Sequence, residues 1–289
     1  MISYQAHLFP REFVSYEMLR VATTRPNGKC VILIMQAVLG RFITALGTIM
    51  MDDISAITLD QGVVELSSHK MPMRLWIYPD DVQHRLENNH KFKTIHIDLH
   101  TLAHDMDKIL ARIRTIAGFG RRIYARQTVV ARVDKRITTA FLTEHHLQTP
   151  MPGKYRYGLY FEGELVSIAV FSGGRKMQGQ SEDYRSFELI RFCHKRDFIA
   201  IGGLSKLIAA FRKDFKPGDL MTYVDRDWSQ DSSLQQIGFI EKGTLAPQPV
   251  VIPQKLTVAN TLDEEKDNST SQKMNSGSTK LVLPFDITN

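Results

Sequence analysis

The strongest constraint on the fold is a hairpin pattern in the second half of the chain. Two runs rich in β-branched and aromatic residues, YRYGLYF (155–161) and ELVSIAVF (164–171), flank the pair Glu162-Gly163. A two-residue loop with glycine in second place is a common connection between two antiparallel strands. The pattern therefore predicts a β-hairpin over 155–171.

The segments around this hairpin carry equally distinct signals. Asp134 is placed to cap a helix that carries Ile137, Phe141 and Leu142 inward. The following segments predict a strand (RSFELIRFC, 185–193), a helix opened by Gly202-Gly203, a strand (DLMTYVD, 219–225), a short helix (SSLQQI, 232–237) and a last strand (GFIEKG, 238–243). The predicted order is helix, hairpin, strand, glycine turn, helix, strand, helix, strand.

The first part of the chain has weaker signals. KCVILIM (29–35) predicts a strand, although the whole apolar run 31–51 fits a buried helix or two buried strands. Arg41 would be costly at the centre of a bilayer, so the run is not expected to span a membrane. Further on, the sequence predicts two strands around Gln61-Gly62, a strand in MRLWIYP (73–79), a half-buried strand in KTIHIDLH (93–100), and a helix from Leu102 that Gly118 and Gly120 end.

Together these elements predict an α+β fold. A mixed sheet with flanking helices forms the C-terminal half, and a smaller α/β or α+β domain precedes it. The expected divisions are an N-terminal domain of unclear role ending in a basic helix (1–120), a second domain (121–249), a flexible polar linker (250–278) and a segment that returns as an edge strand (279–289). Two cysteines and the lack of a secretory pattern at the N-terminus favour a reducing, cytoplasmic setting.

The net charge of +6 is concentrated in one stretch. Residues 105–136 contain nine Lys/Arg against three Asp, which equals the whole excess. Such a stretch is either an electrostatic footprint for DNA or RNA or a solvated helix face followed by a basic turn. The residues that could contact phosphates or stack on bases are Arg112, Arg114, Arg121, Arg122, Arg126, Arg132, Arg175, Arg226 and Trp228.

The order of elements in the second domain resembles the GNAT N-acyltransferase fold. In that family, an Arg/Gln-x-x-Gly-x-Gly/Ala turn after the central strand holds the pyrophosphate of coenzyme A. The stretch 200–205, AIGGLS, is similar, but Ala200 stands at the basic or amide position. The resemblance implies that acetyl-CoA or another acyl-CoA binds at Ile201, Gly202, Gly203, Leu204, Ser205 and Lys206, because glycines at a helix N-terminus let backbone N–H groups approach a phosphate. A tight turn without a ligand is the alternative.

A closer resemblance is to a GNAT-like family of bacterial and phage proteins. It rests on Phe141–Gln148, Tyr155–Arg175, Arg185–Lys195, Thr222–Ser229 and similar phrases at 120–128 and 275–283. Some phage relatives look like homing-endonuclease proteins, and the phage DNA-modification protein Mom is a distant look-alike. This resemblance implies a nucleic acid, or a target bound to one, as the acceptor.

The GNAT resemblance also implies catalytic roles. Glu188 would be the base that removes the proton of an amine, although an ion pair with Arg191 or Arg185 is the alternative. The family's tyrosine acid is replaced by Leu234, and Tyr223 is the candidate substitute. A transferase of this kind requires the strands that carry Glu188 and residues 222–225 to separate next to Gly203.

No metal is expected. His96, Asp98, His100 and His104 gather in one region, but alternate polar residues on a half-exposed strand need no ligand, and nothing completes a site. One of His145 and His146 is expected to line the cleft, since adjacent helical residues diverge by about 100°. Two functions follow: an acyl-CoA-dependent transferase, or a catalytically inactive protein that binds nucleic acid.

Overall fold

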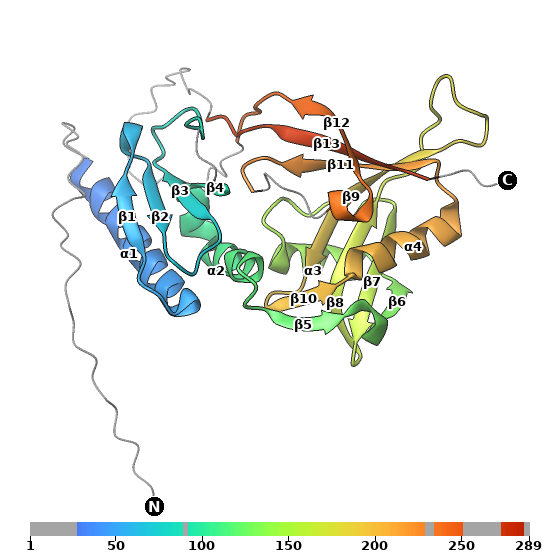
Figure 1. Ribbon diagram of the computed structural model, residues 1–289, viewed down its shortest axis with the longest axis horizontal. Helices are drawn as coiled ribbons and strands as arrows, with labels where there is room; N and C mark the ends of the chain where they lie inside the picture. The colour runs from blue at the N-terminus through green and yellow to red at the C-terminus, as the bar shows by residue number, and fades with distance from the viewer. Residues whose placement is uncertain (1–27, 89–91, 229–233, 251–272, 286–289) are drawn as a thin grey trace, which may run out of the picture.

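The computed structural model describes residues 28–88, 92–228, 234–250 and 273–285, which form an α+β fold around two main sheets and a two-stranded one (Figure 1). Its sheets are mixed, since parallel and antiparallel pairs occur in both large ones. The expected fold class is therefore confirmed. Among the described residues, we find no helix whose length and apolar character would let it cross a membrane.

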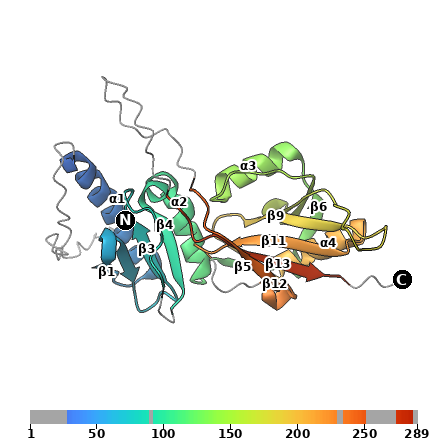
Figure 2. The same cartoon turned by 90° about the horizontal axis from the view of Figure 1, so that it is seen from above.

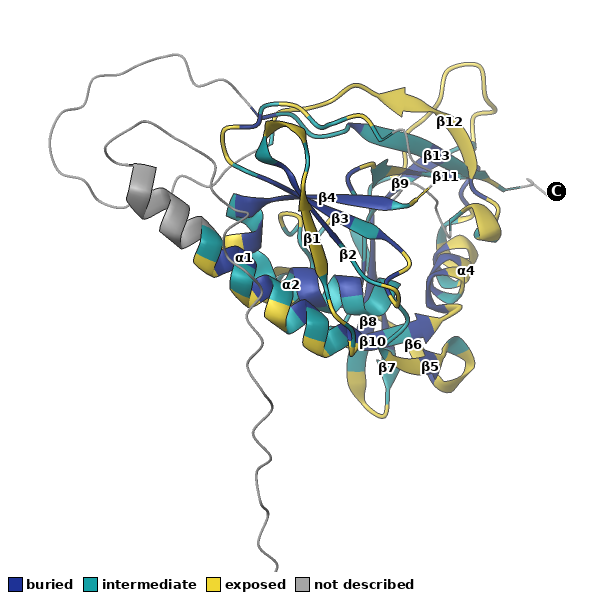
Figure 3. Cartoon of the chain, turned by 60° about the vertical axis from the view of Figure 1, so that its left-hand side comes forward, coloured by how far each residue is buried: buried dark blue, intermediate teal, exposed yellow. Residues whose placement is uncertain are grey.

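The first sheet is formed by the N-terminal part of the chain, in the strand order β1-β2-β3-β4. All neighbours are antiparallel except β3 and β4, which run parallel. Both helices of this part pack on one face, and β4 is buried along its length whereas β1 is exposed (Figure 3). The elements are α1 (Gly28–Met50), β1 (Ser55–Thr58), η2 (Asp60–Gly62), β2 (Val64–Ser67), β3 (Arg74–Tyr78), β4 (Thr94–Asp98) and α2 (Leu99–Ile116).

The strand expected in KCVILIM (29–35) is wrong, because this segment lies in α1. Phe42, Leu46 and Met50 are fully buried at a spacing of four, so the helical period continues to the end of the apolar run. The strands around Gln61-Gly62, the strand in 73–79 and helix α2 are confirmed.

The strand β4 is more buried than its alternating sequence indicates. His96 and Asp98 are buried along with their apolar neighbours. His96 Nδ1 lies 2.8 Å from the hydroxyl of Tyr78, and Asp98 accepts two hydrogen bonds from Arg85. The polar face of β4 therefore meets polar side chains of the protein instead of solvent.

The second sheet has seven strands in the order β12-β13-β11-β9-β8-β7-β6, and β5 and β10 form a separate parallel pair. Only β9 and β11 are parallel in the seven-stranded sheet. The elements are β5 (Arg121–Tyr124), η3 (Ala125–Gln127), β6 (Val129–Arg132), α3 (Lys135–His145), β7 (Tyr155–Phe161), β8 (Glu164–Phe171), β9 (Ser186–His194), β10 (Phe198–Ile201), α4 (Gly203–Phe215), β11 (Asp219–Asp225), η4 (Gln235–Ile237), β12 (Ile240–Leu245) and β13 (Ser278–Pro284).

The helices α3 and α4 cover opposite faces of this sheet. Ile168 and Val170 of β8 pack in the core beneath α3, whereas Ala169 and Phe171 pack in the larger core beneath α4. Alternate residues of a strand point to opposite faces, so the two cores are separated by the sheet. Figure 2 shows α3 standing on one of these faces.

The predicted hairpin is confirmed, with Glu162 and Gly163 both at positive φ, as its turn requires. Asp134 caps α3 by accepting a hydrogen bond from the Arg136 amide, also as predicted. Ile137 was expected to point inward, but it is 49% exposed. The buried residues of α3 are instead Thr138, Phe141 and Leu142. In the first turn of α3, the buried face is therefore shifted by one residue, from the expected Ile137 to Thr138.

The returning strand does not lie at an edge. β13 pairs with β11 on one side and with β12 on the other, so it is inside the sheet. It pairs with β11 over the whole of 278–284 and with β12 over 278–282, so backbone groups on both of its sides are paired. Most of the expected linker lies outside the described residues, as do positions 232 and 233 of the predicted short helix, whose last residues form η4.

Candidate functional site

The parallel strands β9 and β11 separate after a few residues. Their ladder joins residues 219–221 to residues 186–188, and the Thr222 hydroxyl then donates to the Leu189 carbonyl at 2.9 Å. Beyond this point the two strands, which are fully described, share no ladder pair, while each remains paired with its outer neighbour. The expected separation of these strands is therefore confirmed.

A β-bulge marks the place where β9 leaves β11. Leu189 pairs with Phe171 and Arg191 pairs with Val170, so Ile190 is an extra residue without a ladder partner on β8. A bulge bends its strand and re-aims the side chains around it, and bulges are frequent beside active sites. Here it changes which side chains of β9 face the opening.

The glycine turn lies next to the opening, at the start of α4. Gly202 has φ 72°, in the left-handed region that favours glycine. A Cβ on Gly203 would lie 3.0 Å from both Ala200 Cβ and Leu159 Cδ1, so this residue also has to be small. The first intrahelical bond runs from the Lys206 amide to the Gly202 carbonyl. The amides of residues 203–205 therefore have no intrahelical acceptor.

A cavity of about 960 Å³ occupies the opening between the strands. Its walls come from β9, β11, the glycine turn and η4, and also from α2 and the end of α3. A cavity of this size and composition is typical of a small-molecule or cofactor site. Because the lining includes residues from both faces of the sheet, it extends through the gap between β9 and β11.

Two half-buried imidazoles line this cavity. His194 Nδ1 lies 2.6 Å from Ser167 Oγ, and His146 Nδ1 accepts from the Gln148 amide at 3.0 Å. Burial lowers the pKa of both histidines to about 4, and the charges of Arg112 and Arg191 lower that of His146 further. Both imidazoles are therefore neutral at pH 7 and could accept a proton.

Charged residues lie in the same cavity. Arg112 of α2 stacks on Trp228 with its guanidinium carbon 4.5 Å from the ring centroid. Burial lowers the pKa of Arg112 and of Arg191, although guanidinium groups remain protonated in proteins. Burial and the nearby charge of Asp227 raise the pKa of Asp225, which also lines the cavity.

Four of the six residues proposed for acyl-CoA lie in the wall of the cavity: Gly202, Gly203, Leu204 and Ser205. Ile201 is 42% exposed and lies outside the lining. The ammonium of Lys206 instead donates to the carbonyls of Ala125 and Thr128, which holds η3 against the start of α4.

The two residues with proposed catalytic roles lie in different surroundings. Tyr223 is 40% exposed and lines the cavity. Glu188 occupies the last ladder position before the strands separate, but it does not line the cavity, and its carboxylate lies 4.0 Å from the guanidinium of Arg175. The partner of Glu188 is therefore Arg175 and neither Arg191 nor Arg185, and both catalytic roles remain predictions.

The arginines proposed for nucleic acid do not form one surface. Arg121, Arg122, Arg126 and Arg132 are exposed along β5, η3 and β6, and we call them the arginine strip. Arg126 stacks on exposed Tyr124 at 4.9 Å. All four are exposed, although Arg132 forms an ion pair with Asp214 at 2.8 Å and Arg121 forms one with Glu162 at 3.7 Å.

The remaining arginines of this group have other surroundings. Arg114 forms an ion pair with Asp197 at 2.8 Å, and Arg226 donates to the Ser276 carbonyl at 3.2 Å. Arg112 and Trp228 lie in the cavity instead of on the outer surface. Their proposed contacts with nucleic acid are untested.

A buried ionic cluster ties the N-terminal sheet to the end of β11. Arg85 forms ion pairs with Asp98 at 2.7 Å and with Asp227 at 2.8 Å, and Lys273 forms one with Asp98 at 2.8 Å. Asp98, the carboxylate among the four residues weighed as a metal site, is thus neutralised by Arg85 and Lys273. The described residues contain no group of three or more His, Cys, Asp or Glu that could hold a metal ion.

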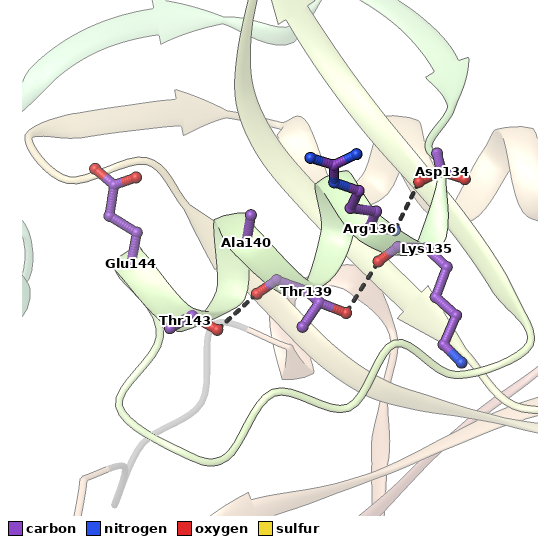
Figure 4. Close-up of a pocket in the computed structure, with 7 residues that line it drawn as sticks. All are labelled: Asp134, Lys135, Arg136, Thr139, Ala140, Thr143 and Glu144. Carbon is purple, nitrogen blue, oxygen red and sulfur yellow. Dashed lines mark hydrogen bonds between the residues drawn. The ribbon is translucent and has the colours of Figure 1, made fainter.

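A second hollow lies on the outer face of α3 (Figure 4). The polar groups drawn there bond within the helix: Asp134 caps it, Thr139 donates to the Lys135 carbonyl, and Thr143 donates to the Thr139 carbonyl. Among the residues that the structure describes, its lining comes from Asp134 and α3 alone, so this hollow lacks the features of a binding site.

Comparison with known proteins gives similarity in structure only. No family model matches the sequence, and no curated protein matches it. The solved structures that resemble this chain include a GNAT family acetyltransferase from Elizabethkingia anophelis with acetyl-CoA bound (12% identity, TM-score 0.32, 55% of this chain and 99% of that one). A second is the ribosomal-protein-S18-alanine N-acetyltransferase from Escherichia coli (10% identity, TM-score 0.37, 56% of this chain and 96% of that one). A third is an IAA acetyltransferase from Bacillus cereus (13% identity, TM-score 0.32, 55% of this chain and 99% of that one). All three TM-scores are below 0.5, so nothing about the site follows from them.

Sequence reasoning did not assign Arg191 and His194 to the site. Both lie on β9 beyond the bulge, where simple alternation no longer tells which face a side chain occupies. His146, one of the two histidines expected at the cleft, does line the cavity.

Proposed function

We propose that this protein is a GNAT-like transferase that uses an acyl-CoA. The observation that carries the proposal is the cavity between two parallel strands that separate next to a glycine turn. The free amides at the start of α4 suit a pyrophosphate, and the unpaired edges of β9 and β11 suit the amide groups of a pantetheine arm.

The residues present fit such a donor. Gly202, Gly203 and Ser205 would hold its phosphates, because they line the cavity at the start of α4, where the amides of residues 203–205 have no intrahelical acceptor. The donor would supply an acyl group activated as a thioester. Tyr223 lines the cavity and is proposed to protonate the leaving sulfur. Glu188, the last residue of β9 paired with β11, is proposed to act as the base.

Calorimetry with acetyl-CoA tests this function. We expect the full chain to bind acetyl-CoA, and Ser205→Asp to weaken binding by about tenfold or more, because a carboxylate would face the phosphates. The substitution adds a negative charge at a helix N-terminus, which does not destabilise the helix. Ala209→Glu, an exposed position one turn further along α4, is the matched control and should bind normally. A wild-type chain that gives no heat with millimolar acetyl-CoA would refute the function.

We also propose that the arginine strip binds DNA or RNA, the target to which the acyl group would be delivered. The supporting observation is that four exposed arginines lie on successive elements and that one of them, Arg126, stacks on exposed Tyr124. A protein that carries only this activity, without transfer, is the alternative function.

Fluorescence anisotropy with labelled oligonucleotides tests the strip. We expect log affinity to fall linearly with log salt, and Arg122→Ala/Arg126→Ala to reduce the slope by about 2, one for each lost phosphate contact. Arg136→Ala on α3 removes an exposed charge elsewhere and should leave the slope unchanged. Binding that does not respond to salt, or no binding, would contradict a role in nucleic-acid recognition.

A further inference from the structure

Two arginines of the cavity come from distant parts of the chain. Arg112 projects from α2, and Arg191 lies on β9 just after the bulge. Both line the same cavity as His146, and both guanidinium charges lower the pKa of that imidazole. Arg112 also acts on the thiol of Cys193, which packs in the core beneath α3. Arg191 faces the α3 side, because its neighbour Phe192 packs in the core beneath α4 and Arg191 donates to the Thr149 carbonyl just after α3, whereas the glycine turn belongs to the α4 face.

Neither guanidinium is satisfied by the described residues. Arg191 donates to the Ile190 carbonyl at 2.8 Å and to the Thr149 carbonyl at 3.3 Å, but its Nε–H is buried without an acceptor. Arg112 stacks on Trp228 and has no hydrogen-bond acceptor among these residues. A buried donor left unpaired is costly, and a buried charge more so.

The nearby carboxylates do not neutralise the pair at close range. Within the described part of the chain, no carboxylate lies within 4.0 Å of either guanidinium. Asp225 is the acidic group that acts on Arg112, and Glu188 is the one that acts on Arg191, but Glu188 already lies beside Arg175. His146 is uncharged at pH 7, so one cation of the pair lacks a counter-ion.

We propose that Arg112 and Arg191 form an anion site for the acyl acceptor, which carries a phosphate or carboxylate group near its reacting amine. The assignment to the acceptor rests on the proposed transferase function, because it places the donor at the glycine turn on the other side of the gap. An anion between the two guanidinium groups receives the Nε–H of Arg191 and the free donors of Arg112. It also offsets the excess positive charge.

Calorimetric titration of the full chain with inorganic phosphate, and separately with succinate, tests the site at constant ionic strength set with chloride. We expect at least one of the two anions to bind, and Arg112→Gln to weaken this binding by about tenfold or more, as the loss of a charged hydrogen bond does. Arg112→Lys, which keeps the charge, should retain part of the affinity. Arg136→Gln, which removes an exposed arginine from α3, should bind like wild type. Thermal unfolding checks that each variant is folded.

The preference between the two anions identifies the acceptor class. Tighter binding of phosphate indicates a phosphorylated acceptor such as a nucleotide, and tighter binding of succinate indicates a carboxylate. Binding of neither anion by the wild-type chain, or equal binding by wild type and Arg112→Gln, overturns the proposal.

A titration of Arg112→Gln with acetyl-CoA separates this inference from the proposed function. We expect its affinity for acetyl-CoA to stay within about twofold of wild type. A loss as large as that for phosphate would assign the arginines to the donor and overturn the acceptor site. If wild type binds phosphate through Arg112 but does not bind acetyl-CoA, the transferase function fails while the anion site stands.

Discussion

Replacing Arg85 with methionine is expected to lower the free energy of unfolding by about 3–5 kcal/mol. The Arg85 side chain is 7% exposed and donates to the carboxylates of Asp98 and Asp227, which are equally buried. Without the guanidinium, the Asp227 carboxylate keeps the Ser276 amide as a donor, and Asp98 keeps Lys273. The two buried carboxylates would then have too few hydrogen-bond donors and too little positive charge around them, which is costly away from solvent. Urea unfolding followed by circular dichroism measures the change.

The matched control is Arg132→Met, which breaks the ion pair of Arg132 with Asp214. Both of those side chains are substantially exposed, so the loss should be about 1 kcal/mol or less. A change of this small size for Arg85→Met would mean that the ionic cluster contributes no more than a surface pair. The cluster joins the N-terminal sheet to the residues after β11, and we therefore expect Arg85→Met also to disturb Trp228 in the cavity.

Acidification is expected to destabilise the protein strongly between pH 7 and pH 5. Burial lowers the pKa of His96, His146 and His194 to about 4, from an ordinary value of 6.5. On acidification, the unfolded chain thus takes up protons at these imidazoles at a higher pH than the folded chain does. The stability they contribute is complete above pH 6.5 and is lost as the pH falls towards 4. Each should cost about 2 kcal/mol between pH 7 and pH 5, or about 6 kcal/mol together.

Asp225 acts in the opposite sense. Because the pKa of its carboxyl is raised in the folded chain, the folded chain takes up this proton at a higher pH than the unfolded chain does. Protonation of Asp225 therefore offsets part of the loss of stability. Asp98 adds to the loss of stability at lower pH: burial would raise the pKa of its carboxyl, but Arg85 and Lys273 hold that pKa below 3.8.

Urea unfolding at pH 7, 6 and 5 measures how the free energy of unfolding depends on pH. His194→Asn should reduce the loss by about 2 kcal/mol, and His69→Asn, at an exposed position, serves as the control. A stability that stays flat from pH 7 to pH 5 would contradict the buried neutral histidines.

Where the sequence predicted the structure well, the signals were local. The hairpin follows from the positive-φ turn at Glu162-Gly163, the start of α3 from the cap at Asp134, and the start of α4 from Gly202. The failures occurred where burial depended on distant partners. KCVILIM (29–35) was expected to be a strand, but apolar residues alone do not separate a buried strand from a buried helix.

The candidate site was predictable only in part. Its glycine turn has a recognisable sequence, and the separation of β9 from β11 was expected from the resemblance to the GNAT fold. The arginine pair was not predicted, because Arg112 belongs to a helix of the first sheet and Arg191 is turned into the cavity beyond a bulge. Arg112 was expected to contact phosphates of a nucleic acid, but it lines the cavity, where we propose that it binds an anion.

Turns, caps and hydrophobic periods are properties of neighbouring residues, and for this reason the sequence alone determined the hairpin, the capped helix α3, the amphipathic helix α4 and the strands beside them. Only the tertiary structure decided that β13 enters the sheet between β11 and β12, that the polar face of β4 is buried, and that Arg112 and Arg191 line one cavity between β9 and β11. These features depend on contacts between segments far apart in the chain. A local sequence pattern carries no information about the energies of such contacts.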